Sequence, residues 1–440
     1  MENINYELTR LEGEHREAKI VKFSNIPLNK IKEFPACMFH VQSTEDINAL
    51  KQYFFQNAPN DRIFGLSVPF SYLSTYVPEL IDQVHIPRNT TLMCDLETEI
   101  FWHSTEKLKP KIGQFFASYG AIPVRIKQKI SKITTTKKFT ERIESHKKFW
   151  REITNEKSDL ISLITAYISR QHGYQIGILS GLSPLILDRE HLDFVEESYT
   201  QTKRLYHNDA SINLENDGKI VGLYANFHTT FLAKSENVTE FVKMVERLEP
   251  KALIFKIFNL EDIRNMKVIQ KNYELLIKNI ANLSRTLNIP TFYFGTHTAG
   301  IEANTKGIDV FSEPFNRKTS DERQFTISSE QLHRMYNEDP LFKAGKIYDI
   351  TKNDFISRRE FQNKYLTTSR IELPLPFITS TYTSNAVKSM TDVHFRNFSR
   401  MVLMESRNYE LNQLHNEINN SDISSTLNKV AIWKGNHIPK

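Results

Sequence analysis

Short apolar runs recur along the chain, and polar segments with helical periodicity separate most of them. Eight of the runs have the length of β-strands, and most are continuously apolar, which is typical of strands covered on both faces. The eight runs are residues 36–42, 62–68, 90–97, 174–180, 219–226, 251–257, 291–296 and 307–313.

The segments between these runs carry apolar residues at helical spacing. The clearest covers residues 265–287 and stops at Asn288, before Pro290. Its apolar stripe consists of Ile269, Tyr273, Leu276, Ile280 and Leu283. The other helical patterns between strands are residues 44–56, 139–171, 190–206 and 236–248.

Strands that alternate with helices predict a parallel sheet built through right-handed crossovers. Because eight strands close a (β/α)8 TIM-type barrel, we predict an α/β fold of this type for residues 1–318. A doubly wound open sheet is the alternative. The absence of a G-x-G-x-x-G motif after the first strand argues against it.

Residues 319–440 do not continue the alternating pattern, so we expect a mostly helical C-terminal extension or a small domain there. Residues 345–385 favour short helices, and residues 386–420 favour a longer one. The two prolines of "IELPLPFITSTYT" argue against a central strand in this part of the chain.

About 75 residues separate the third and fourth predicted strands, which indicates an insertion at about 100–150. Residues 106–151 hold thirteen lysines and arginines against three glutamates, although the whole chain has a net charge of only +5. Such a local excess attracts phosphate backbones, and the aromatic residues among the charges suit stacking on unpaired bases. A solvated helix face is the alternative. The candidate nucleic-acid-binding residues are Lys137, Lys138, Lys147 and Lys148.

The composition indicates in which compartment the protein works and whether it carries a metal or cofactor. No run approaches 18 consecutive apolar residues, so we expect no membrane-spanning helix, and the polar N-terminus does not resemble a signal peptide. Cys37 and Cys94 are the two cysteines, which fits a reducing, cytoplasmic setting. Zinc, calcium and Walker A motifs are absent from the sequence, so we predict no metal and no cofactor.

Polar residues follow the predicted strands, and in a parallel barrel the carboxyl ends of the strands hold the active site. Asp95 is the sharpest case, because an apolar run delivers one carboxylate at its end. A helix cap or an ion pair is the alternative role for it. The candidate catalytic residues are Asp95, Ser312 and Glu313. The candidate substrate-binding residues are Ser180, Asn226, His228, Gly295, His297, Asp309 and Arg317.

Two segments resemble the tRNA-guanine transglycosylase family, which includes relatives that act on DNA. "YFGTHTAGIEANTKGIDVFSEPFNR" resembles the end of that family's barrel, where a Gly turn and a helix around "EA" precede "GxDxFD", a proline and an arginine. The matching residues are Gly295, Glu302, Ala303, Gly307, Asp309, Phe311, Pro314 and Arg317. "TLMCDLETEIFW" is similar to the segment in which a strand runs into the family's "DSGG" aspartate.

This resemblance implies exchange of a guanine base in RNA or DNA for a deazaguanine, through a covalent sugar intermediate. Asp95 matches the aspartate of "DSGG", which recognises the base and acts as an acid or base. Ser312 stands where the family has its nucleophilic aspartate, and Glu313 is the adjacent carboxylate that would step in. "LET" stands where the family has "SGG", and no cysteine follows Cys94 to form the family's zinc site.

Three functions therefore remain open on the sequence. The first is a divergent transglycosylase-like enzyme that uses Asp95 with Glu313. This hypothesis predicts tRNA or DNA as the partner. The second is a non-catalytic subunit that binds nucleic acid, a protein partner or a second copy of itself. The third is a metabolic barrel enzyme on a small phosphorylated substrate, bound at the "GTHTAG" turn.

Overall fold

The computed structural model describes residues 36–56, 62–84, 91–98, 124–133, 139–174, 176–208, 219–258, 267–295, 298–315, 346–352 and 354–419. Its centre is one eight-stranded sheet with the strand order β3-β2-β1-β10-β9-β8-β7-β5, in which every neighbouring pair is parallel. The strands are β1 Ala36–His40, β2 Ile63–Pro69, β3 Thr91–Asp95, β5 Leu185–Ile186, β7 Leu223–His228, β8 Leu253–Phe258, β9 Thr291–Phe294 and β10 Val310–Pro314.

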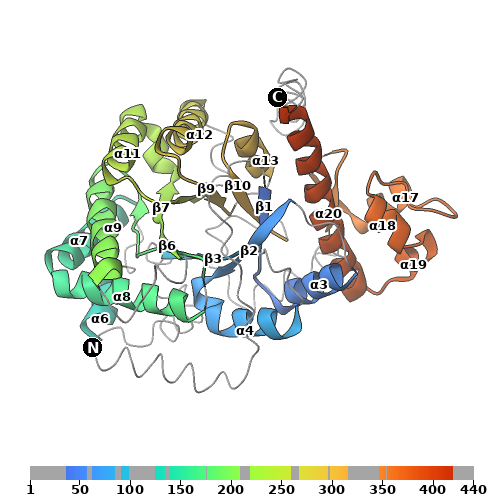
Figure 1. Cartoon of the computed structure of the whole chain (residues 1–440), viewed down its shortest axis with the longest axis horizontal. Helices are drawn as coiled ribbons and strands as arrows, with labels where there is room; N and C mark the ends of the chain where they lie inside the picture. The colour runs from blue at the N-terminus through green and yellow to red at the C-terminus, as the bar shows by residue number, and fades with distance from the viewer. Residues whose placement is uncertain are drawn as a thin grey trace.

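The pairing of β1 with β10 joins the start of the α/β segment to its end. Figure 1 shows the strands curled around a common centre with helices outside them. An α/β fold with a curled parallel sheet is therefore confirmed.

A second, two-stranded parallel sheet pairs β4 (Ile178–Leu179) with β6 (Ile220–Val221). It is connected to both end regions of the main sheet. The Gly177 backbone N–H donates to Leu92 O of β3 at 2.9 Å, and β6 leads directly into β7.

The predicted strand 174–180 is the prediction that differs most from the structure. Among the described residues of this run, only Ile178 and Leu179 are extended as a strand, and they belong to the small sheet. The position beside β7 in the main sheet belongs to β5, which the sequence pattern did not indicate. Gly177, Gly181 and Pro184 interrupt this stretch. The two strands in it, β4 and β5, are therefore too short to show as long apolar runs in the sequence.

Helices cover the outside of the sheet, largely where the periodicity predicts them. In α12, all five residues of the predicted apolar stripe are buried. Asn288 follows α12 in the left-handed conformation at φ 56°, a usual way to end a helix. The helices that follow strands are α3 Thr44–Phe55, α4 Leu73–Gln83, α9 Glu190–Asn208, α11 Ser235–Leu248, α12 Lys267–Leu287 and α13 Thr298–Thr305.

In the described residues of the insertion after β3 lie α6 Val124–Ile133, α7 Phe139–Asn155 and α8 Lys157–Gly173. The sequence pattern indicated one helix over 139–171, whereas the structure has two. They divide at Glu156, just after Thr154 turns its hydroxyl back to Trp150 O at 2.7 Å. Side chains of this type that bond to the backbone of the preceding turn weaken and bend helices.

From residue 346, where the description of the C-terminal part starts, the chain forms an antiparallel hairpin of β11 (Lys346–Asp349) and β12 (Asp354–Ser357), where only short helices were expected. Three short helices follow, and then a long one packs against α3 and β11. Figure 1 shows the long helix beside the main sheet and the short helices on its outer side. These helices are α17 Arg358–Tyr365, α18 Pro376–Thr381, α19 Ser384–Ser389 and α20 Asp392–Asn419.

Candidate functional site

The inner face of the sheet carries a group of polar side chains near the carboxyl ends of the strands. Residues paired across parallel strands point to the same face, and successive residues in one strand alternate between faces. The register pairs His40 with Ser67 and Met38 with Ser312, so these side chains share one face. In the other half of the sheet, β7 and β8 pair Asn226 with Lys256, so these two side chains also share one face.

Asp95, the last residue of β3, accepts hydrogen bonds from across the interior. The Tyr224 hydroxyl on β7 donates to its Oδ1 at 2.7 Å, and Lys256 Nζ on β8 donates to its Oδ2 at 3.0 Å. His40 Nε2 on β1 lies 4.0 Å from the same Oδ2. All four residues are buried. Side chains from four strands therefore meet at one carboxylate.

The charge of Asp95 follows from these contacts. Burial by itself raises the pKa of this carboxyl, but the Lys256 ammonium, His40 and the hydrogen bond from Tyr224 outweigh it and lower the pKa to about 2. At neutral pH Asp95 is therefore an anion. It is suited to accept hydrogen bonds or to stabilise positive charge, and it has no proton to donate.

His40 also begins a chain of hydrogen bonds along the inner face. Its Nδ1 lies 2.9 Å from Ser67 Oγ, and Ser67 Oγ lies 2.7 Å from Ser312 Oγ. Ser67 and Ser312 are almost completely buried. The chain joins β1, β2 and β10, three neighbouring strands, and its His40 end lies 4.0 Å from Asp95.

The segment "DLET" (95–98) at the end of β3 is held in place by a hydrogen bond at each of its polar residues. Glu97 N–H donates to Asp95 Oδ1 at 3.2 Å, and Glu97 has a left-handed backbone with φ 51°. Its Oε2 accepts from Ser71 N–H at 2.9 Å, while the Thr98 hydroxyl accepts from Asn226 Nδ2 at 3.3 Å. Non-glycine residues in this conformation store strain, and such strain is concentrated at functional sites.

Gly295, after β9, lies beside the Asp95 cluster. Its φ is +70°, and a Cβ built on it would meet Lys256 Cε at 3.2 Å. A glycine is thus required here both by the backbone conformation and by the lysine that contacts Asp95.

Glu313 does not lie with Asp95, which corrects the expectation that the two carboxylates share a pocket. It follows Ser312 in β10, so its side chain points to the opposite face of the sheet. There it forms a fully buried two-pronged ion pair with Arg407 of α20, at 2.6 and 2.8 Å. Tyr348 and Glu410 hydrogen-bond to the same arginine. These contacts give Glu313 a structural role.

Asp309 is also removed from the cluster, in contrast to its predicted role in substrate binding. Its Oδ2 accepts from the backbone N–H and the hydroxyl of Thr291, each at 2.8 Å, and from the Ser284 hydroxyl at 3.1 Å. Thr291 is the first residue of β9, so these bonds lie at the amino end of the strands, away from the end that Asp95 occupies. Asp309 therefore fastens β9 to the loop before β10.

Two further candidates, Ser180 and His228, take part in local contacts. Gln171 holds the backbone of Ser180 through its side-chain amide, at 2.7 and 3.0 Å. His228 Nδ1 accepts from Thr230 N–H at 3.2 Å and so caps the short helix η3 (Thr229–Ala233). Burial and the charge of Arg142 lower the pKa of His228 to about 4.

The described basic residues of the insertion are largely engaged in ion pairs. Lys147 lies 2.6 Å from Asp188 and 3.3 Å from Glu190, and Lys129 contacts Glu156 and Asp159. Lys148 is exposed. These pairs reduce the positive charge that this part of the insertion presents. Four predicted residues, His297, Arg317, Lys137 and Lys138, lie outside the described residues.

The sequence reasoning missed His40, Ser67 and Tyr224. A signal existed for His40 and Ser67, because each is a polar residue near the carboxyl end of an apolar run. No signal distinguished Tyr224 within its apolar strand. Lys256 carries a signal too, because a lysine inside an apolar strand needs a partner, and in the structure Asp95 is that partner.

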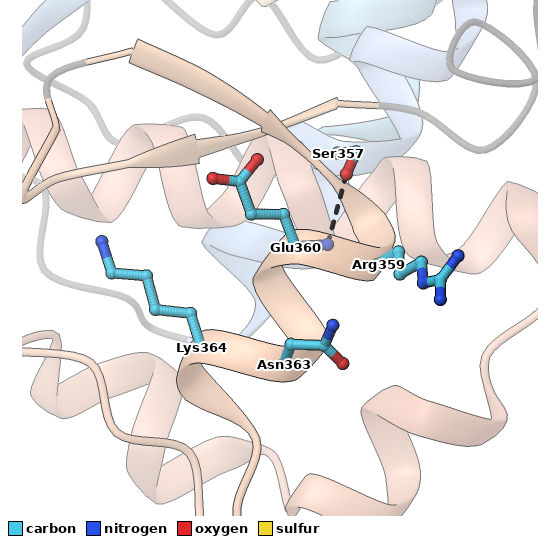
Figure 2. A pocket seen from close by; sticks show the side chains of 5 residues that line it. All are labelled: Ser357, Arg359, Glu360, Asn363 and Lys364. Carbon is cyan, nitrogen blue, oxygen red and sulfur yellow. Dashed lines mark hydrogen bonds between the residues drawn. The ribbon is translucent and has the colours of Figure 1, made fainter.

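Other kinds of site are less well supported. Among the described residues, no three His, Cys, Asp or Glu side chains are grouped to hold a metal ion, and no helix is long and apolar enough to cross a membrane. A surface hollow of about 390 Å³ lies at α17, and Figure 2 shows its lining. The lining residues are Ser357, Arg359, Glu360, Asn363 and Lys364, none of which belongs to the Asp95 cluster.

A comparison of the sequence with models of protein families finds no match, and a comparison with curated proteins finds none either.

Proposed function

We propose that this protein is a transglycosylase-like (β/α)8 barrel that recognises a guanine-type base of RNA or DNA at the carboxyl ends of its strands. In this proposal the small β4–β6 sheet spans the opening between β3 and β5 and completes the barrel. The hydrogen bond from Gly177 to Leu92 supports that closure.

The observation that carries the proposal is the ionised Asp95 beside Lys256 and Tyr224. A guanine base presents N–H donors next to its O6 acceptor, so its edge requires an acceptor and a donor side by side. Asp95 supplies the acceptor, and the Lys256 ammonium, which gives one of its three protons to Asp95 at 3.0 Å, supplies the donor beside it. Enzymes that act on bases read a flipped base by such hydrogen bonds.

The proposal is tested by guanine binding to the full chain, measured by calorimetry. Asp95→Asn removes the charge with little change in shape, and we expect affinity for guanine to fall about 10- to 100-fold, the range for a hydrogen bond to a charged group. Asp309→Asn makes the same chemical change at the far end of the sheet, and affinity should not change. Equal affinity in wild type and Asp95→Asn would contradict the assignment.

A base-binding subunit without exchange activity is the second candidate, and the position of Glu313 favours it. The ion pair with Arg407 keeps that carboxylate away from Asp95, so it is not available as the substitute nucleophile. Incorporation of labelled guanine into a guanosine-containing RNA hairpin, or into DNA of the same sequence, separates the candidates. Incorporation supports the enzyme, and binding without incorporation or base release supports the subunit.

A further inference from the structure

The hydrogen bonds of the His40 chain have a direction. The anionic Asp95 lies 4.0 Å from His40 Nε2, so its charge favours a proton on that nitrogen. His40 Nδ1 is then an acceptor and takes the single hydroxyl proton of Ser67, 2.9 Å away. Because the single hydroxyl proton of Ser67 is already in the hydrogen bond to His40, the Ser67 oxygen accepts a hydrogen bond from Ser312, 2.7 Å away. Every donor in the chain thus points toward Asp95.

A chain with this polarity transfers protons from one end to the other. When a group at Ser312 gives a proton to the Ser312 oxygen, each hydroxyl passes its own proton onward, and His40 Nδ1 receives one. The imidazolium that forms is stabilised by Asp95, as a carboxylate stabilises the histidine of a catalytic triad. Burial of the chain excludes bulk water from this path.

From this geometry we infer that Ser312, Ser67 and His40 form a proton relay that serves glycosyl transfer at the Asp95 site, with Ser312 at the end of the chain opposite His40. The inference rests on the proposed recognition of a guanine-type nucleoside. It gives the Asp95 site acid–base groups that do not depend on Glu313, which faces α20.

The relay accounts for each atom of the step. The entering water, or the entering base in an exchange, bonds to the sugar C1′ while the bond from C1′ to the leaving base breaks. The electron pair of the broken bond goes to the nitrogen of the leaving base. The proton of the entering group passes through Ser312 and Ser67 to His40 Nδ1, and the proton on His40 Nε2 passes to the leaving nitrogen. The side chains end with the same number of protons.

The test uses the full chain, with a guanosine-containing RNA hairpin and DNA of the same sequence as probes. Guanine release and incorporation of labelled guanine are both measured. Ser312→Ala and Ser67→Ala should each lower kcat about 100-fold, at the lower end of the range for general acid–base catalysis, with guanine affinity unchanged. Ser284→Ala removes a buried hydroxyl at the far end of the sheet and should leave kcat unchanged.

The pH profile separates a relay from a packing role. In wild type, kcat should depend on pH, and in His40→Gln, which lacks the imidazole of the relay, that dependence should disappear. Ser312→Thr keeps a hydroxyl and should restore part of the activity that Ser312→Ala loses. Thermal unfolding of each variant checks that it is folded.

The outcomes distinguish the relay from the proposed function. Folded Ser67→Ala and Ser312→Ala variants with wild-type kcat would overturn the relay and leave base recognition by Asp95 intact. A wild type that binds guanine but neither releases nor incorporates it would also overturn the relay. A wild type that does not bind guanine would overturn the proposed function and the relay together.

Discussion

Ser312 and Glu313 are neighbours in β10, and their side chains serve opposite faces of the sheet. Ser312 hydrogen-bonds to Ser67 inside, whereas Glu313 is paired with Arg407 outside. Both residues are buried, so the difference lies in their partners and not in their exposure. At the scale of single residues, the alternation of a strand decides which polar group can reach the candidate site.

The ion pair between Glu313 and Arg407 provides the first prediction. Glu313→Gln takes from the buried Arg407 its two-pronged carboxylate and leaves it Glu410, and we expect the free energy of unfolding to fall by about 3 kcal/mol. Glu313→Leu combined with Arg407→Met removes the buried pair and should recover part of that loss, because Glu410 then lacks its arginine. Urea unfolding measures both. A double variant as unstable as Glu313→Gln would show that the buried charge is not the cause.

Gly295 provides the second prediction. Gly295→Ala forces a side chain into a left-handed position, which costs roughly 1 kcal/mol, and it also displaces Lys256 from Asp95. Gly307→Ala has the same backbone problem at φ +104°, but its neighbours are Arg285 and Ala281. Both variants should lose stability in urea unfolding, and only Gly295→Ala should lose guanine affinity. An equal loss of affinity in both would argue against the contact with Lys256.

At the scale of elements, a buried chain of imidazoles docks α7 of the insertion on α9. Trp150 Nε1 donates to His146 Nε2 at 3.1 Å, which makes His146 Nδ1 the donor to His191 Nε2 at 3.0 Å. His191 Nδ1 then donates to Asp188 at 2.9 Å. Each ring nitrogen of the two histidines is either a donor or an acceptor in these bonds. An added proton on either ring would therefore place an N–H opposite an existing N–H donor. Burial lowers the pKa of both histidines.

This arrangement predicts how stability depends on pH. His146, His191 and His228 have folded pKa values below the ordinary value of 6.5, so the unfolded chain binds more protons just below pH 6.5. The free energy of unfolding should therefore fall as the pH falls below 6.5. For His228, whose pKa is about 4, the loss by pH 4 is about 3 kcal/mol.

The measurement is urea unfolding between pH 7.5 and 4. Asp95 adds its own loss only below its ordinary pKa of 3.8, so its effect does not overlap with that of the histidines. His228→Gln should flatten part of the decline. Unchanged stability of the wild type from pH 6.5 to 4.5 would contradict the prediction.

At the scale of the whole molecule, α20 is bound to the first part of the α/β fold by buried polar contacts. Arg400 Nε lies 2.7 Å from Asp46 of α3, and the Tyr53 hydroxyl donates to Glu405 at 3.2 Å. With the Glu313–Arg407 pair, these contacts join segments more than 90 residues apart in the chain. The C-terminal part is thus integrated with the sheet.

A chain that ends at residue 345 tests this integration. It lacks α20, so Asp46 and Glu313 keep buried charges without their arginines, and we expect loss of cooperative unfolding. Near-ultraviolet circular dichroism and binding of a hydrophobic dye measure the loss of fixed packing. A truncated chain with the same unfolding transition as the full chain would show that residues 1–318 form an independent domain.

The sequence by itself determined most of the succession of strands and helices between residues 36 and 315, because continuous apolar runs and helical stripes reflect which faces are buried. It also indicated Asp95 as a residue at a strand end. Only the tertiary structure decided that β5 takes the place beside β7, and that Lys256, Tyr224 and His40 surround Asp95 while Glu313 belongs to α20. The physical reason is that partners of a buried charge come from strands far apart in the chain, so their distances depend on how the sheet curls.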